Sequence, residues 1–561
     1  MRFFPSAPRA VLLTLSLLSA CAAADPTASA DRAPKSTGHY GNFLAGRFAL
    51  NHGDYDAAAA DLSRALAANP NDQELLVQTF LACVNAGRPE AIPLARRLPN
   101  NQIAQLVLGN DAAKSGDWAQ ATGIYRALPR DGVMQLLQPL LVAWASQGSG
   151  ATDQALATLR PIMDAPRYKS LAALHAGMIA DLAGRTRDAA IYYQQAAADV
   201  GEITARSALI LASWQARAGD QAGAERTLAK MASGILEMGI AVPALTASLG
   251  KRPVARALDG LSEVYATFAG ALRARETTDF AMILSRFALD VRPDSGFGHL
   301  LAADIQAAAK RPESALRLLD AVLDSKDPIV PVIRLRHAGA LHRLERTDEA
   351  IREVERIGRD YPASALPDQE LGDLLRIKRR FGEAIIAYDR VVARIRKPGP
   401  NDWSVYYSRG IAFERTGQWA KAEADFFHAL ELSPDQPSVM NYLGYSWADM
   451  GRNLDKAHDL IQRAANRRPN DGAITDSLGW VLYRQGKYAE AMKLLERAAG
   501  LEPEDSSITE HLGDVYWAIG RRIEAHYQWR RALTLNPTPD DAAKLESKIK
   551  SHPFGTVASG R

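Results

Sequence analysis

The residues of this sequence whose side chains could most readily take part in covalent chemistry are its two cysteines, Cys21 and Cys83. Cys21 ends an apolar run in the stretch LLSAC, where its thiol can accept a covalent group. Cys83 lies in FLACVNAG, a helical pattern that predicts a small buried hydrophobe. Because Cys83 has no second cysteine to pair with once Cys21 is modified, the sequence predicts no disulfide framework.

Other signatures of chemistry are incomplete. His337 and His342 are five residues apart, a spacing that does not put both side chains on one helical face, so no metal site is expected there. Gly296 and Gly298 follow no predicted strand and do not complete a nucleotide-binding glycine pattern. The patterns HExxH, GxSxG, GxxxxGK[ST] and CxxC are absent. The sequence therefore predicts a protein that is not an enzyme, with no catalytic residue, metal, cofactor or small-molecule substrate.

The segment before Cys21 has the layout of a secretory signal. Arg2 and Arg9 precede an apolar stretch from Ala10 to Ala20 that ends in small residues. At about 11 residues this stretch is well short of the roughly 20 that a permanent membrane-spanning helix needs. We therefore expect residues 1–21 to form a signal peptide region that ends at Cys21, and the segment before the cleavage site to be removed.

The end of that signal, Leu18–Ser19–Ala20–Cys21, resembles the lipobox of bacterial lipoproteins. This resemblance implies that Cys21 becomes the acylated first residue and anchors the chain in a membrane. Ala22, rather than an aspartate, follows the cysteine, as in lipoproteins of the outer membrane that face the periplasm. The alternative is cleavage within residues 22–24, which would leave a soluble periplasmic protein.

The nearly equal numbers of basic and acidic residues bear on whether nucleic acid is a partner. The chain has 67 Lys and Arg against 64 Asp and Glu, a formal charge of +3 over 561 residues. Such a balance supplies no general basic field, so nucleic acid is not an expected partner.

A repeat with a period of 34 residues organises the sequence. The segment that contains Gly479 and the segment that contains Gly513 carry glycine, alanine and proline at the same spacings. Small residues at these places let two antiparallel helices cross closely, and the proline ends the second helix. The structural positions predicted in this way are Gly410, Ala422, Gly444, Gly479, Ala491, Ala498, Pro503, Gly513, Ala525, Ala532 and Pro537.

This period and its small, aromatic and proline positions resemble the tetratricopeptide repeat (TPR). The resemblance implies an all-α fold, an α-solenoid of about 14 helical hairpins in a TPR superhelix. The expected organisation is a signal peptide (1–21), a flexible tether (22–39), an N-terminal array (40–234), an irregular break (235–262), a C-terminal array (263–540) and a tail (541–561). The break leaves two alternatives open, a split into two lobes or a divergent repeat with an extended loop.

In TPR arrays, fixed positions of each first helix line a concave groove. Carried over to this sequence, these positions predict a partner-binding groove of aromatic side chains flanked by carboxylates and an amide. For the aromatic residues, packing between adjacent first helices is the alternative to groove exposure. The predicted groove residues are Tyr407, Asn441, Tyr445, Asp476, Trp480, Tyr483, Arg484, Glu510, Asp514 and Trp517.

Residues 400 to 535, which include the turn GRNLDKA and the sequence DSLGWVLYRQG, resemble proteobacterial outer-membrane TPR lipoproteins. That family includes an adaptor for a carboxyl-terminal processing protease. The resemblance implies a scaffold that holds a periplasmic protease and its cell-wall hydrolase substrates together. The alternative is a structural or assembly component of an outer-membrane biogenesis or polysaccharide export machine.

Overall fold

The computed structural model describes residues 38–198, 204–273 and 278–552. Within these ranges every regular element is a helix, with 30 α-helices, two short 3₁₀ helices and no β-strand. The predicted signal peptide, Cys21 and the predicted tether up to residue 37 lie outside the described residues. No helix in the described ranges combines the length and the apolar composition needed to cross a bilayer.

The chain divides into two compact units, residues 1–99 and residues 100–561. In the first unit α1 and α2 pack as a hairpin, and α3 packs on α2. Gly46 makes the hairpin crossing close, because a Cβ atom there would lie 2.7 Å from the Leu62 side chain. The helices of this unit are α1 (His39–Asn51), α2 (Tyr55–Ala68), α3 (Gln73–Ala86) and α4 (Ala91–Arg96).

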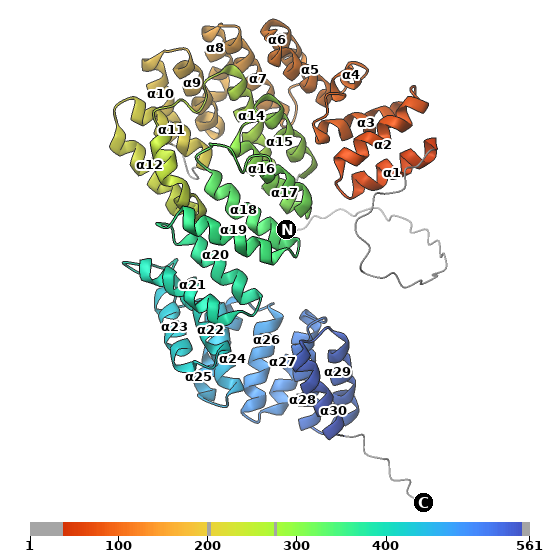
Figure 1. The fold of residues 1–561 in the computed structure, drawn as a ribbon, viewed down its shortest axis with the longest axis vertical. Coiled ribbons are helices and arrows are strands. Elements are labelled where there is room, and N and C mark those ends of the chain that lie inside the picture. The colour runs from red at the N-terminus through yellow and green to blue at the C-terminus, as the bar shows by residue number, and fades with distance from the viewer. Residues whose placement is uncertain (1–37, 199–203, 274–277, 553–561) are drawn as a thin grey trace, which may run out of the picture. The chain divides into compact units, whose positions relative to one another are not determined.

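The second unit contains the remaining helices (Figure 1). Up to the middle of the chain they are α5 (Gln102–Lys114), α6 (Trp118–Ala127), α7 (Met134–Gly148), α8 (Thr152–Met163), η1 (Pro166–Tyr168), α9 (Lys169–Leu182), α10 (Thr186–Ala198), α11 (Ala205–Arg217), α12 (Gln221–Gly234), η2 (Leu236–Ala241), α13 (Val242–Ser248), α14 (Ala257–Arg273) and α15 (Thr278–Val291). After them come α16 (Gly296–Ala308), α17 (Pro312–Asp320), α18 (Val330–Arg343), α19 (Thr347–Asp360), α20 (Leu366–Ile377), α21 (Phe381–Arg394), α22 (Trp403–Arg415), α23 (Trp419–Leu432), α24 (Pro437–Asp449), α25 (Leu454–Arg467), α26 (Gly472–Arg484), α27 (Tyr488–Leu501), α28 (Ser506–Ala518), α29 (Arg522–Thr534) and α30 (Pro539–Ser551).

Local sequence explains where these helices begin and end. The Asp471 and Asp505 side chains accept hydrogen bonds from backbone amides at the starts of α26 and α28, which satisfies donors that the first turn leaves free. Gly486 and Gly520 occupy the left-handed region, with φ of 79° and 85°, in the short turns to α27 and α29. Consecutive helices therefore pair, and the described helices form 14 hairpins. The predicted α-solenoid is confirmed.

Small residues lie at the helix crossings of the C-terminal hairpins. A Cβ atom on Gly479 would lie 2.7 Å from Leu495 Cγ, and one on Gly513 would lie 2.5 Å from Trp529 Cδ1. Ala491 is fully buried on the partner helix of the first of these crossings. The other alanines of the predicted structural set, Ala422, Ala498, Ala525 and Ala532, are fully buried as well. Such crossings bury apolar stripes that an isolated hairpin would leave in water.

Helix α14 departs from this neighbour-to-neighbour order. It packs against α7 and α9 as well as α15, and α15 packs against α5 (Figure 1). Gly260 of α14 lies against the buried indole of Trp144 in α7. The hydroxyl groups of Tyr265 in α14 and Tyr125 in α6 each donate to Asn110 Oδ1 in α5 over 2.7 Å. The chain itself therefore covers part of the surface of α5, α7 and α9.

Two regions are described more closely by the structure, the break at residues 235–262, where two alternatives were left open, and the expected tail. The irregular break at residues 235–262 does not separate two lobes, because one hydrophobic core continues through it and includes Met238 and Leu245 together with Leu228 and Ile333. η2 and α13 occupy the break, and α14 already begins at Ala257. The tail expected after residue 540 contains α30 up to Ser551, which the Thr538 side chain caps and whose Leu545 is fully buried.

Candidate functional site

The ten predicted groove residues lie on four first helices of successive hairpins. Tyr407 belongs to α22, Asn441 and Tyr445 belong to α24, four residues belong to α26, and three belong to α28. α26 packs against both α24 and α28. The residues that the structure connects across these helices are Tyr445, Asp476, Trp480, Tyr483, Glu510, His511, Asp514 and Lys548, which we call the α26–α28 cluster.

Trp480 and His511 form the centre of the α26–α28 cluster. Their rings stack with centroids 4.0 Å apart and an interplanar angle of 15°. Trp480 also stacks on Tyr483 of the same helix, and it is only 8% exposed. Of the two alternatives for this residue, packing between adjacent first helices is therefore the one found in the structure.

His511 is held by Asp476, and both side chains are buried. The His511 Nδ1–H donates to Asp476 Oδ2 over 2.9 Å. Burial acts to lower the pKa of His511, but the charge and hydrogen bond of Asp476, with Asp514 and Glu510 nearby, outweigh burial and raise the pKa above 6.5. The raised pKa favours an imidazolium, whose charge is attracted to the face of the Trp480 indole.

Lys548 of α30 occupies the other side of the cluster. Its Nζ donates to Glu510 Oε1 over 2.5 Å and to Asp514 Oδ2 over 2.6 Å. Asp514 Oδ1 also accepts from the indole N–H of Trp529 over 2.9 Å. Burial opposes the charge of Lys548, but the two carboxylates outweigh it and raise its pKa. Two carboxylates of the predicted groove are thus already paired within the chain, by a residue that the sequence placed in the tail.

Four predicted groove residues lie outside the cluster, namely Asn441 on α24 and three others. Tyr407 packs among Trp403, Phe426 and Tyr442. Trp517 contacts His526, Trp529 and His552 near the end of α30. The Arg484 guanidinium donates to the Asp449 carbonyl over 2.6 Å and lies 5.9 Å from the centre of the Trp480 ring.

Two buried polar atoms on the facing helices lack a hydrogen-bond partner among the residues that the structure describes. They are Asn441 Oδ1 on α24 and the indole nitrogen of Trp480 on α26. A buried polar atom without a partner costs about 1–3 kcal/mol, so each atom destabilises the fold unless another group supplies the missing bond. One is an acceptor and the other is a donor, and a peptide backbone offers both complementary groups.

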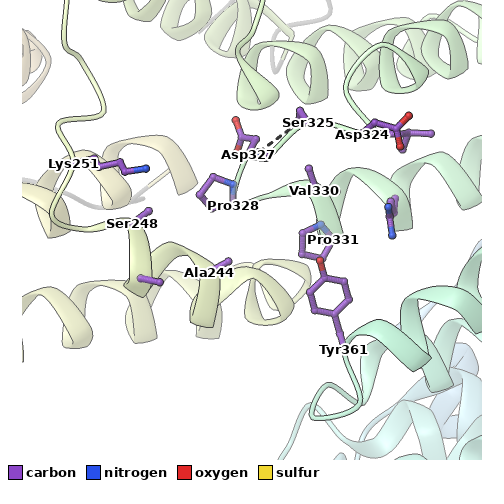
Figure 2. A pocket seen from close by; sticks show the side chains of 14 residues that line it. Ala244, Ser248, Lys251, Asp324, Ser325, Asp327, Pro328, Val330, Pro331 and Tyr361 are labelled. Atoms are coloured by element: carbon purple, nitrogen blue, oxygen red, sulfur yellow. Dashed lines mark hydrogen bonds between the residues drawn. The ribbon is translucent and has the colours of Figure 1, made fainter.

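A separate cleft of about 580 Å³ lies beside the segment that was expected to be irregular, residues 235–262. It is bounded by α13, the loop 323–328 and the start of α18 (Figure 2). Two of its charged side chains, Asp327 and Arg334, are already paired within the chain. The Asp327 carboxylate accepts from the backbone amides of Gly296 and Ile329, and Arg334 pairs with Asp360 over 3.1 Å. None of the predicted groove residues lines this cleft. No group of three or more potential metal ligands occurs in the described ranges.

Comparison with known proteins agrees with this architecture. A family model described as a tetratricopeptide repeat matches residues 370–437, 407–472, 443–507 and 477–538. The TPR repeat-containing protein PA4667 of Pseudomonas aeruginosa is 32% identical over 164 residues, which are 28% of this chain and 26% of the relative. The match thus spans about a quarter of that relative's length.

Two solved structures are similar to this chain at lower identity. A tetratricopeptide repeat protein from Parabacteroides merdae is 15% identical, with a TM-score of 0.38, over 44% of this chain and 96% of its own. The hetero-tetramer Cut9–Hcn1 of the APC/C is 16% identical, with a TM-score of 0.39, over 91% of this chain and 96% of its own. The comparisons therefore show that residues 370–538 of this all-helical solenoid contain tetratricopeptide repeats.

Proposed function

We propose that this protein is a lipid-anchored scaffold of the bacterial outer membrane, without catalysis of its own, that binds protein partners in the periplasm. Tetratricopeptide repeats generally mediate protein–protein interaction. The observation that carries the proposal is the pair of buried, unpartnered polar atoms Asn441 Oδ1 and Trp480 Nε1 on adjacent first helices. A partner segment crossing α24 and α26 would satisfy both atoms with its own backbone.

The surfaces that the chain already covers support the location that we propose for the binding site. In the N-terminal part of the second unit, α14 and α15 lie on α5, α7 and α9. Around α28, Lys548 neutralises Glu510 and Asp514. The face of α24 and α26 is therefore the part of the predicted groove that we assign to the partner.

The partner class rests on the resemblance of residues 400 to 535 to proteobacterial TPR lipoproteins. This resemblance supports two kinds of partner, a periplasmic serine protease of the carboxyl-terminal processing class and the cell-wall hydrolases that are its substrates. Joining both on one membrane-anchored chain would raise their effective concentration without a new catalytic group.

Replacing Asn441 with leucine tests the binding face. The substitution removes the amide that would pair with the partner and keeps a side chain of similar size, so we expect about tenfold weaker binding of the protease. The measurement is capture of the protease from detergent-solubilised envelope, followed by titration of the purified pair.

Gln528→Met is the matched control for this substitution. Gln528 lies on α29, a second helix, and its Oε1 is also buried without a hydrogen-bond partner in the described ranges. We expect protease binding to be unchanged in Gln528→Met. Equal losses in both variants would overturn the assignment of the face, and capture of no protease by the unaltered chain would overturn the partner.

Replacing Cys21 with serine tests the anchor. Serine lacks the thiol that would be acylated, so the variant is expected to lose incorporation of labelled palmitate and to move from the membrane fraction to the soluble fraction. An unaltered chain that takes up no palmitate in its own host would contradict the proposed anchor.

A further inference from the structure

The outer face of α1 is an exposed apolar stripe. Leu44 is 65% exposed and Phe48 is 63% exposed, and Tyr40, one turn earlier on the same face, is 79% exposed. Side chains four residues apart on a helix lie next to one another, so the three form a continuous ridge. A contiguous patch of this kind marks an interaction surface more often than a scattered apolar residue does.

Interior helices bury the same position. Phe48 lies two residues after Gly46, and its counterparts are Ala412, Val481 and Val515, two residues after Gly410, Gly479 and Gly513. These counterparts are fully buried, and the preceding helices α21, α25 and α27 pack on their helices. α1 therefore has the packing face of an interior helix, and no described helix precedes it.

α30, the last helix at the other end of the array, differs from α1 in the polarity of its exposed side. The exposed side of α30 carries Lys544, Glu546, Ser547 and Lys550, which are polar. A polar outer face is what the terminal element of a repeat array needs in water. The apolar stripe of α1 therefore has no counterpart on α30, the last helix of the array.

We propose that the Tyr40–Leu44–Phe48 stripe rests on an anionic phospholipid surface, a contact that builds on the lipid anchor in the proposed function. α1 contains no Asp or Glu, and its exposed charge is Arg47, which complements anionic headgroups. Sixteen residues lie between Cys21 and Gly38, a span of at most roughly 60 Å, and α1 is the first described helix after them. Aromatic and aliphatic side chains beside a basic residue are typical of helices that lie in the interface of a bilayer.

The direct test uses the full acylated chain in vesicles of phosphatidylethanolamine and phosphatidylglycerol. Single cysteines at Leu44→Cys or Phe48→Cys receive an environment-sensitive fluorophore, while Cys83 is buried and protected. Nitroxide groups on the lipid chains are expected to quench both probes. Ile523→Cys on α29 is the control, because Ile523 is 71% exposed but lies far along the chain from the anchor, and its probe is expected to stay unquenched.

A second measurement separates the stripe from the anchor. The chain from Ala22 onward keeps every described residue and lacks the acylated cysteine. Its sedimentation with the same vesicles is expected to fall about tenfold in Leu44→Glu/Phe48→Glu, because two exposed apolar side chains become charged. Ile523→Glu/Tyr527→Glu replaces an equally exposed apolar pair on α29 and is expected to sediment as the unaltered chain does.

The outcomes distinguish the two proposals. Absence of palmitate labelling in the unaltered chain, with sedimentation of the chain from Ala22 retained, would overturn the anchor and leave the stripe supported. Unquenched probes at both positions would overturn the stripe. Disulfide cross-linking of Leu44→Cys between two chains, without lipid quenching, would show that the stripe contacts a second copy of the chain. That result would also overturn the proposed contact with lipid.

Discussion

Replacing Gly260 with alanine is expected to destabilise the second unit by about 1–3 kcal/mol, because α14 could no longer approach α7 closely. A Cβ atom at Gly260 would lie 2.2 Å from Trp144 Cδ2. The indole cannot move away freely, since Trp144 is fully buried and its Nε1–H donates to His175 Nδ1 over 3.0 Å. Burial lowers the pKa of His175 to about 3, which keeps the imidazole neutral and its Nδ1 able to accept.

Gly270→Ala on the same helix is the matched control. The atom nearest to a Cβ at Gly270 is 4.0 Å away, so alanine fits there. Alanine in a helix interior is favoured over glycine by up to about 1 kcal/mol, and this variant is expected to be slightly stabilised. Urea unfolding gives the two free-energy changes, and hydrogen exchange shows whether α7 and α14 loosen together. Stabilisation by both substitutions would refute the close contact.

The repeat architecture could be predicted from the sequence because its contacts are local. Gly479 and Gly513 recur at the repeat period, and each lies against the second helix of its own hairpin. The return of α14 onto α7 could not be predicted in this way. It depends on pairs such as Tyr265 and Asn110, which are 155 residues apart, and a periodic pattern carries information only about neighbouring repeats.

The candidate site was partly predictable for the same reason. The period placed Asp476, Trp480 and Asp514 on consecutive first helices, where the structure has them. The same period, continued past Pro537, leads from Asp514 to Lys548, so the cation that pairs with Asp514 was present in the pattern. The expected array ends at residue 540, whereas Pro539 stands at the first position of α30, where a proline is tolerated.

His511 could not be predicted from the groove positions. It lies one residue after Glu510, on the side of α28 that meets α26, and its importance comes from Asp476 and Trp480 across that contact. The packing of Trp480 could not be predicted for the same reason, because it also depends on the contact between α26 and α28. An aromatic residue at a groove position is exposed or buried according to the side chain opposite, and that side chain is fixed only in three dimensions.

Replacing Asp476 with asparagine is expected to destabilise the C-terminal hairpins by about 3 kcal/mol at pH 5.5, because an imidazolium would be buried without its counter-charge. The folded pKa of His511 is raised above its unfolded value near 6.5. The stabilisation from the pair is therefore complete below pH 6.5 and is lost as the pH rises through the folded pKa. The difference between the unaltered chain and Asp476→Asn should shrink accordingly towards pH 9.

A double-substitution cycle isolates this effect. His511→Phe keeps a ring on Trp480 but cannot titrate, so in that background Asp476→Asn should have the same effect at every pH. Urea unfolding from pH 5.5 to 9 provides the free energies, and the NMR titration of the His511 ring reports its pKa directly. A difference that stays constant with pH in the unaltered background would mean that His511 is neutral in the folded chain. In that case Asp476 would hold His511 by an ordinary hydrogen bond, and the charge on the Trp480 face would be absent.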